Sequence, residues 1–246
     1  MRRTLWLVLI GLLAFLGFII ARLPASWIAP GANSPVSCTD IDGTVWSGTC
    51  TGLTAYRQTY GDLSWEVHPL RLLAGKLSAS VVLVRGTGSA RGLVDAGLGR
   101  NVTARNVLAD LPLDPTLLPQ LPGDLHGSVH ADLPLLVLHG EQLQALQGRI
   151  EVHDLVQGAG AAARPLGSYS LEFPPGSNGP PVGHLRDLGG PLAVEGSLRL
   201  TPEPGVSVEG LVAARPTAPP DLQQEIQFLG SPDAQGRRLF SFAATF

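Results

Sequence analysis

Polar and apolar residues alternate strictly along much of the chain. Residues 62–68, 76–83 and 124–133 carry an apolar side chain at every second position, and similar runs recur from residue 149 to the last residue. Alternation of this kind is typical of antiparallel strands that bury one face and expose the other. About ten such runs, mostly five to nine residues long, predict a mainly β fold with a curved, mostly antiparallel β-sheet or open half-barrel.

Helical patterns are few in the part of the chain that follows residue 22. Residues 113–121, 141–146 and 220–228 are each predicted to hold a helical turn or two. Residues 176–190 are rich in glycine and proline, and this composition predicts a long loop.

An uncharged apolar segment occupies residues 4–21, directly after Arg2 and Arg3. A helix of this length rises about 27 Å, which is close to the roughly 30 Å hydrocarbon core of a bilayer. The segment therefore predicts a transmembrane helix. The positive-inside rule places residues 1–3 in the cytoplasm.

A cleaved signal peptide is the competing interpretation of this segment. The apolar core of a signal peptide usually has about 7 to 15 residues and is followed by a small-residue cleavage site. The run in this chain is longer, and the nearest candidate site, residues 23–25, has a proline at its centre. We therefore expect an uncleaved anchor, then a linker over residues 22–37, and a β-rich domain outside the cytoplasm over residues 38–246.

Cys38 and Cys50 are the only cysteines of the chain, and both follow the predicted anchor. An oxidising compartment favours a disulfide between them. The alternative is that each cysteine is a separate small core residue. Two cysteines are too few for a structural zinc site, which takes four ligands.

No residue pattern in the chain points to catalysis or to a cofactor. Ser47 has Val45 two positions before it, where the nucleophile elbow of a hydrolase needs glycine. His126 and His130 share a solvated strand face, but four residues along a strand span about 13 Å, too far for one metal ion. The net charge of −3 does not suggest nucleic-acid binding. The sequence thus predicts no catalytic residue, no metal, no cofactor and no nucleic-acid partner, and a protein that is not an enzyme.

Two short motifs follow the predicted anchor. The first reads Gly-Thr-Val-Trp-Ser-Gly at residues 43–48, and the second is a spaced series of tryptophan, proline, leucine and glycine over residues 63–77. The residues that carry them are Gly43, Thr44, Trp46, Ser47 and Gly48 in the first motif, and Trp65, Pro69 and Gly75 in the second. Together with residues 228–237, they resemble the type II secretion system protein N family, or general secretion pathway protein N. The cysteine pair is not part of the family pattern.

The resemblance implies an accessory component of the type II secretion apparatus, which exports folded periplasmic proteins from Gram-negative bacteria. It implies a single-pass protein of the cell inner membrane, with its C-terminal domain in the periplasm. The implied partners are other secretion subunits, either of the inner-membrane platform or of the outer-membrane channel. The implied role is to contact other proteins. Independently of the resemblance, Trp46 and Trp65 are expected to lie in the core of the sheet, because aromatic side chains bury a large area.

Two alternatives stay open. AsmA-like lipid-transfer modules share the architecture of an anchor and a curved sheet with an apolar face, and small residues such as Ala79 and Ala131 lie on that face here. An open apolar groove would favour lipid transfer, whereas a face filled by its own side chains would favour a scaffold. An outer-membrane barrel is the other alternative, but its strands need about 9 to 11 residues, more than most of these runs have.

Overall fold

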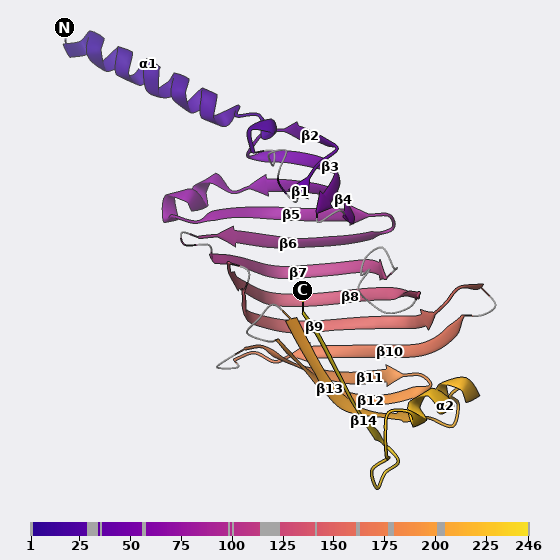
Figure 1. The fold of residues 1–246 in the computed structure, drawn as a ribbon. Helices are drawn as coiled ribbons and strands as arrows, with labels where there is room; N and C mark the ends of the chain where they lie inside the picture. Colours follow the sequence, from indigo (N-terminus) through magenta and orange to yellow (C-terminus); the bar gives the residue numbers. More distant parts are fainter. Residues whose placement is uncertain are drawn as a thin grey trace.

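The alternating residues form one long β-sheet (Figure 1). The computed structural model describes residues 2–28, 34, 36–55, 58–97, 99, 101–113, 124–140, 142–160, 163–176, 180–200 and 205–245. Its helices are α1 (Arg2–Ala21) and α2 (Pro220–Gln227), with short 3-10 helices η1 (Ala25–Ile28) and η2 (Pro69–Ala74). Its strands are β1 (Val36–Ser37), β2 (Asp40–Gly43), β3 (Ser47–Ala55), β4 (Gln58–Val67), β5 (Leu77–Arg85), β6 (Gly88–Ala96), β7 (Asn101–Leu113), β8 (Leu125–His139), β9 (Gln142–Gln157), β10 (Arg164–Phe173), β11 (Val182–Gly189), β12 (Leu192–Leu200), β13 (Gly205–Ala214) and β14 (Arg238–Thr245).

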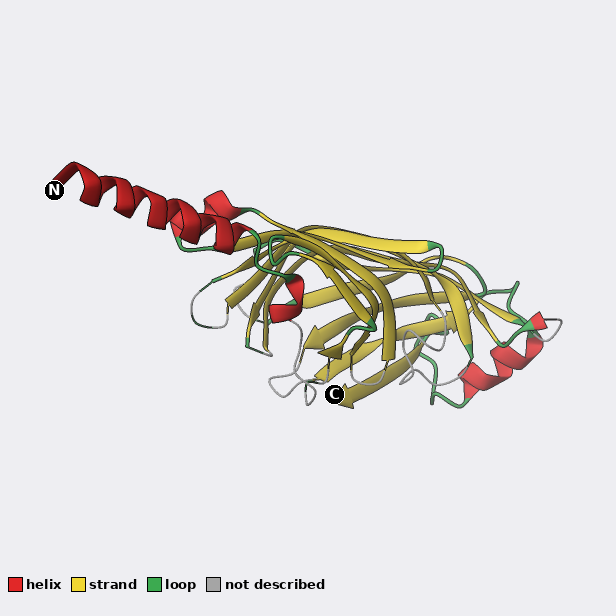
Figure 2. Ribbon diagram, turned by 90° about the horizontal axis from the view of Figure 1, so that it is seen from above, coloured by secondary structure: helices red, strands yellow, loops and turns green. Residues whose placement is uncertain are grey.

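Each strand from β3 to β14 pairs with its neighbours in the sequence, and every pair is antiparallel. β1 and β2 both pair with β3. The sheet curls rather than lying flat, as Figure 2 shows. In the described part of the chain, its two end strands β1 and β14 do not pair with each other. The prediction of a mainly β, antiparallel and open sheet is confirmed.

The strands are longer than the alternating runs predicted. β7, β8 and β9 have 13, 15 and 16 residues. Asn106 and Asp154 each adopt a positive φ of 50° at positions where the strand register shifts. Such β-bulges insert one extra residue and reverse the apparent alternation, so a single strand looks like two short runs.

The minor elements agree with the sequence only in part. α2 confirms the helix predicted over residues 220–228. The helical turn predicted over residues 141–146 is wrong, because β9 starts at Gln142 and pairs with β8 there. The long loop predicted over residues 176–190 is wrong in its second half, which forms β11. The helix predicted over residues 113–121 lies outside the described residues beyond Leu113, which ends β7.

α1 runs from Arg2 to Ala21 and so includes the segment predicted to cross a membrane. Among the residues that the structure describes, no helix has both the length and the apolarity needed to cross a membrane.

The strand register holds apolar residues on one face across the whole sheet. Starting from β2, successive cross-strand partners form an unbroken line without a single charged side chain. We call this line the apolar row: Ile41, Cys50, Leu63, Leu83, Ala90, Ala109, Ala131, Ile150, Leu171, Leu185, Gly196, Gly210 and Phe240. At about 4.8 Å between strands, the row is about 55–60 Å long along the sheet surface.

The adjacent line of partners is polar at eleven of its thirteen positions and lies on the opposite face. We call it the polar row: Asp42, Thr49, Ser64, Val82, Arg91, Leu108, Asp132, Arg149, Glu172, His184, Ser197, Glu209 and Ser241. The two rows lie on opposite faces of the sheet, because successive side chains of a strand point to opposite sides. We refer to these faces as the apolar face and the polar face.

Among the described elements, no helix outside the sheet lies against most of the apolar face. Apart from neighbouring strands, the substantial contacts between elements join η1 to β2, η2 to β5 and α2 to β13. Sheets normally bury their apolar face against another layer, and here most of the apolar row is only half-buried. Nine apolar side chains are buried in the described structure, two of them Leu222 and Ile226 of α2.

A half-buried ion pair between Asp187 and Arg215 connects strands in the C-terminal part of the sheet. The Asp187 carboxylate accepts hydrogen bonds from Arg215 Nη2 at 2.6 Å, and from the N–H groups of Gly189 and Val194 at 3.1 Å each. Arg215 also donates to two carbonyl groups at the start of β12 and in the turn before it. Burial opposes ionisation of Asp187, but these hydrogen bonds outweigh it, and the pKa of Asp187 is lowered.

We expect Asp187→Asn to lower the free energy of unfolding at pH 7 by about 1 kcal/mol, the low end for a hydrogen bond to a charged group, because Arg215 is partly exposed. The folded-state pKa of Asp187 is below the unfolded value of about 3.9, so its contribution is present above that value and is lost as the pH falls through the folded-state pKa. Urea unfolding at pH 7 and pH 3 measures this. The difference between wild type and variant should be smaller at pH 3.

Asp132→Asn is the matched control, because Asp132 is an exposed carboxylate of the polar face. It should change the stability little at either pH. An Asp187→Asn effect of equal size at pH 7 and pH 3 would contradict the charge-based role.

Candidate functional surfaces

The two sequence motifs meet where α1 joins the sheet. Trp46 Nε1 donates a hydrogen bond to the carbonyl oxygen of Ile20, in the last turn of α1, at 2.8 Å. Trp65 Nε1 donates to the carbonyl oxygen of Val45 at 3.2 Å. The two tryptophans therefore connect the helix, the β2–β3 turn and β4. Both rings are half-buried.

The first motif forms the turn between β2 and β3. Gly43 has a φ of +94°, which residues with a Cβ rarely adopt. The Thr44 N–H donates to the Ser47 carbonyl at 2.8 Å, and the Ser47 N–H donates to Thr44 Oγ1 at 3.2 Å. The positive φ explains the glycine, and the bond to the hydroxyl group explains the threonine, whereas Ser47 takes part through its backbone groups.

Part of the predicted linker lies along this turn. The Val45 N–H donates to the Leu23 carbonyl at 3.0 Å, and Pro24 forms a β-bridge with Thr44. Ala25 is only 1% exposed. Residues 23–25 thus join α1 to the sheet, whereas the linker assignment for the rest of residues 22–37 stays a prediction.

Trp65 lies across a glycine of the neighbouring strand. Gly48 is its cross-strand partner, and a Cβ built on Gly48 would lie 2.5 Å from the Trp65 ring. The same contact occurs between Phe173 and Gly183 at 2.8 Å, and between Phe240 and Gly210 at 2.9 Å. The three rings lie flat over glycines on the apolar face.

The second motif folds η2 onto the polar face. Pro69 begins η2, and Gly75 ends it with a φ of +70°. Arg71 of η2 lies 3.7 Å from Asp95, whose other carboxylate oxygen is 3.3 Å from Arg105. Asp95 is only 6% exposed, so the two arginines compensate a buried charge.

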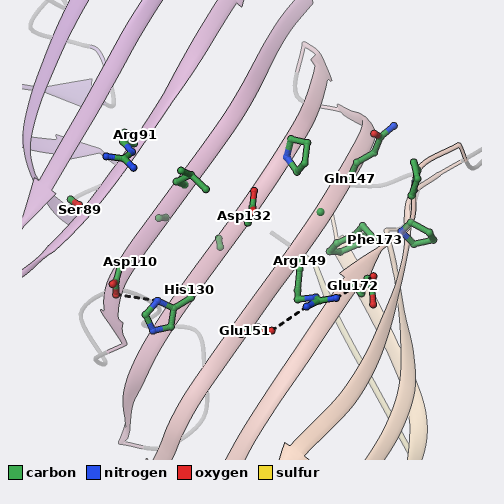
Figure 3. Close-up of a pocket in the computed structure, with 17 residues that line it drawn as sticks. Ser89, Arg91, Asp110, His130, Asp132, Gln147, Arg149, Glu151, Glu172 and Phe173 are labelled. Carbon is green, nitrogen blue, oxygen red and sulfur yellow. Dashed lines mark ion pairs between the residues drawn. The ribbon is translucent and has the colours of Figure 1, made fainter.

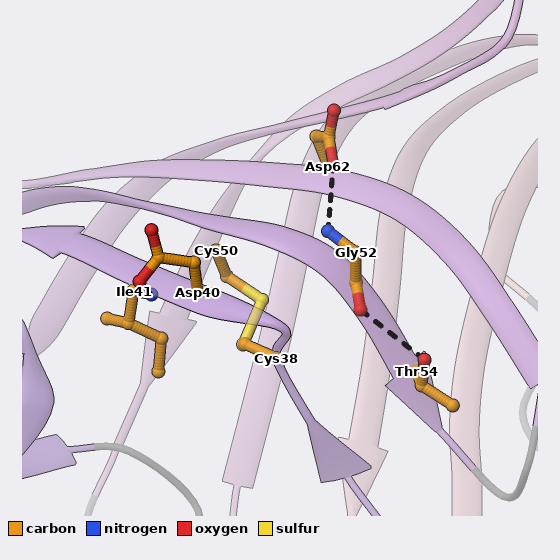
Figure 4. Close-up of a disulfide and its surroundings, with 7 residues drawn as sticks. All are labelled: Cys38, Asp40, Ile41, Cys50, Gly52, Thr54 and Asp62. Carbon is orange, nitrogen blue, oxygen red and sulfur yellow. Dashed lines mark hydrogen bonds between the residues drawn. A yellow bond between two sulfur atoms is a disulfide. The ribbon is translucent and has the colours of Figure 1, made fainter.

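Cys38 and Cys50 are joined by a disulfide, with Cα atoms 5.5 Å apart (Figure 4). Cys50 is 2% exposed. Beside it, β3 bulges at Gly52, whose N–H donates to the Asp62 carboxylate at 2.8 Å instead of to a strand partner. The disulfide connects the segment before β2 to β3 and so fixes this end of the sheet covalently.

The polar face is hollowed over β6 to β10, with a cavity of about 790 Å³ (Figure 3). Several of its charged side chains are paired with one another. Arg149 lies 3.7 Å from Glu151 and 3.5 Å from Glu172, and His130 Nδ1 lies 3.4 Å from Asp110. Paired charges of this kind suit a solvated surface.

The other histidine noted in the sequence, His126, lies on the same face. His126 Nε2 is 2.9 Å from the Asp124 carboxylate. Over the described ranges, no three residues among His, Cys, Asp and Glu are grouped so that they could hold a metal ion.

The apolar face has a hollow of its own, of about 400 Å³, over β3 to β7. We call it the apolar hollow. Its large lining side chains include Leu53, Leu63, Val81, Leu83 and Val107. Space arises because Ala55, Ala90 and Gly92 are small. The sequence placed the small residues Ala79 and Ala131 on this face. The alternation of apolar and polar residues does not show whether another element covers them.

A family model described as type II secretion system (T2SS), protein N, matches residues 34–241, which include both motifs and nearly all of the sheet. The chain belongs to the type II secretion system protein N family. The type II secretion system protein N of Aeromonas hydrophila is 27% identical over 246 residues, covering 96% of each chain. That of Vibrio cholerae is 25% identical over 239 residues, covering 91% of each chain. No solved structure matches.

Membership of the protein N family confirms the resemblance read from the motifs. It makes the chain a component of the type II secretion system. In structural terms, the first motif and Trp65 of the second motif form the joint between α1 and the sheet, since Trp46, Trp65 and Gly48 all lie there.

We expect Gly48→Ala to destabilise the protein by about 1–3 kcal/mol, because the new methyl group overlaps the Trp65 ring. For a chain of this size, each kcal/mol of destabilisation lowers Tm by roughly 2–4 °C. Thermal unfolding followed by near-UV circular dichroism measures it.

Gly97→Ala is the control, since the nearest atom to its new Cβ is 3.9 Å away. Its Tm should be close to that of the wild type. Equal Tm values for both variants would show that the close contact between Gly48 and Trp65 does not constrain the joint.

Proposed function

We propose that the chain is an accessory component of the type II secretion apparatus, anchored in the inner membrane, which acts through contacts with other subunits during export of folded periplasmic proteins. Family membership supports the system. The observation that supports the mode of action is the outer edge of β14, which pairs with no other strand in the described part of the chain.

The two edges of the sheet differ. At the N-terminal edge, β1 has two residues and β2 has four, and the disulfide holds them to β3. At the other edge, β14 has eight residues and, within the described structure, pairs only with β13. Natural edge strands are usually short, charged, bulged or interrupted by proline. β14 has one charge, Arg238 at its start, and no proline.

An extended segment of another subunit fits this edge. The free side of β14 has backbone N–H and C=O groups that an added strand pairs with, the mode known as β-augmentation. Leu239 and Phe242 are 66% and 50% exposed, so apolar side chains are available on both faces of the edge. We propose the β14 edge as the contact with the inner-membrane platform or the outer-membrane channel.

The proposed anchor is α1. Its large apolar side chains are exposed, with Trp6 at 64% and Phe15 and Phe18 at 61%. Such exposure is unfavourable in water and favourable in lipid. We propose that Arg2 and Arg3 stay on the cytoplasmic side and that the sheet is periplasmic, where an oxidising environment suits the Cys38–Cys50 disulfide.

Lipid handling of the AsmA-like kind is a second candidate function. One observation favours it: the apolar face is left open over most of its length, rather than filled by a second described layer.

We expect Ala243→Lys to abolish co-purification of secretion subunits with the full-length chain and to reduce export of secreted enzymes. A lysine on the exposed face of an edge strand opposes addition of a further strand. Crosslinking in cells, detergent extraction and mass spectrometry measure the contacts, and exported activity in the medium measures secretion.

Ser207→Lys is the matched control, because Ser207 is the partner of Ala243 one strand further from the edge. It adds the same charge to the same face and should leave the contacts intact. Subunits recovered equally with both variants would rule out β14 as the contact edge.

The anchor is tested by alkaline carbonate extraction of membranes. We expect the wild-type chain to stay in the pellet, and a variant with Leu12→Arg and Leu16→Arg to move to the supernatant, because each arginine costs about 2.5–3.5 kcal/mol in the middle of a membrane helix. Arg3→Lys keeps the charge and should behave as the wild type. Extraction of the wild-type chain by carbonate would contradict the anchor.

A further inference from the structure

We propose that the apolar hollow over β3 to β7 binds the acyl chain of a membrane phospholipid. The inference rests on the proposed anchor at α1, which brings this end of the sheet to the bilayer. It adds a ligand-binding site to a chain proposed to act by protein contacts.

The open apolar surface is the first argument. The apolar row crosses thirteen strands without a charged side chain, and most of its members are only half-buried. An apolar surface of this extent normally marks an interaction site. The hollow is the place where the sheet's own side chains leave most space on this face, about 400 Å³.

The side chains that line the hollow favour an acyl chain over a peptide as the ligand. Of the described residues around the hollow, only Tyr60 and Arg91 have polar side chains. A peptide laid across the strands here would lose its backbone hydrogen bonds to water and find no partners, which is costly. An acyl chain has no such groups to satisfy.

The shape of the surface suits a thin, flexible chain. Trp65 lies flat over Gly48 next to the hollow, so its ring does not stand up into the space above the sheet. Ala55, Ala90 and Gly92 form the low part of the surface. The row continues beyond the hollow toward β14, which leaves room for a chain that is longer than the hollow itself.

The location identifies the source of the lipid. β3 and β4 bear the tryptophan joint to α1, through the Trp46 bond to Ile20 and the Trp65 bond to Val45. The hollow begins on these same strands. Figure 1 shows β3 to β7 at the end of the sheet that follows α1. Phospholipid of the membrane that holds α1 is therefore the nearest apolar ligand.

The test is photocrosslinking of the full-length chain in vesicles of phosphatidylethanolamine and phosphatidylglycerol. The probe is phosphatidylethanolamine with a diazirine in one acyl chain, and the crosslinked residues are mapped by mass spectrometry. We expect crosslinks on residues that line the hollow, such as Leu63, Val81 and Val107, in addition to those on α1.

Ala90→Trp fills the hollow from its floor. It should lower crosslinking there by about fivefold or more, as expected when an occupied space is overpacked, and leave the α1 crosslinks unchanged. Ser89→Trp is the matched control, because it adds the same side chain to the same strand on the opposite, exposed face. It should leave both sets of crosslinks unchanged.

The outcomes separate the inference from the anchor. Crosslinks confined to α1 would overturn the lipid site and keep the anchor. Crosslinks in the hollow but not on α1 would support the site and contradict the anchor. Mapping on the wild-type chain needs no variant, so an Ala90→Trp chain that does not fold leaves the test intact. Crosslinks that persist in a folded Ala90→Trp chain would place the lipid elsewhere and overturn the proposal.

Discussion

The structure depends on the cross-strand register, which keeps every member of the apolar row on the same face. Because side chains alternate along a strand, a slip of one residue in any pair would move the rest of the sheet's apolar residues to the polar face. The bulges at Asn106 and Asp154 absorb such a slip locally, since each adds one residue to one strand. The two faces therefore stay apolar and polar from β2 to β14.

A one-layer sheet needs stability from sources other than a thick core. The backbone hydrogen bonds between strands provide much of this stability, and a few specific interactions stabilise the two ends of the sheet. At one end these are the disulfide and the tryptophan joint. At the other, Arg164 of β10 binds Asp221 at 3.0 Å and Glu225 at 2.7 Å, which holds α2 against the sheet. Between the ends, flat rings such as Phe173 over Gly183 cover the strands that they lie beside.

Sequence patterns predicted the features that depend on residues close together in the chain. The antiparallel sheet followed from alternation, and the short helix predicted over residues 220–228 corresponds to α2. The start of β9 was missed because residues 141–146 were predicted to form a helical turn, whereas they pair with β8. β11 was missed because the glycines and prolines of residues 176–190 suggested a loop, whereas residues 182–189 pair with β10. The motif residues were recognised, but their role as a joint depends on a bond between Trp46 and Ile20, 26 positions apart. Alternation predicted an apolar face and gave no information on whether a second layer covers it.

The two ends of the sheet place different demands on their partners. The α1 end is closed by short strands and a disulfide, so no strand adds there easily. The β14 end is open, and its free edge continues both rows. A strand added beside Phe240 would become the next member of the apolar row, because cross-strand partners share a face. Its sequence must therefore alternate with a period of two and place an apolar residue opposite Phe240. A subunit without such a segment does not match this edge, whatever its affinity for other parts of the chain.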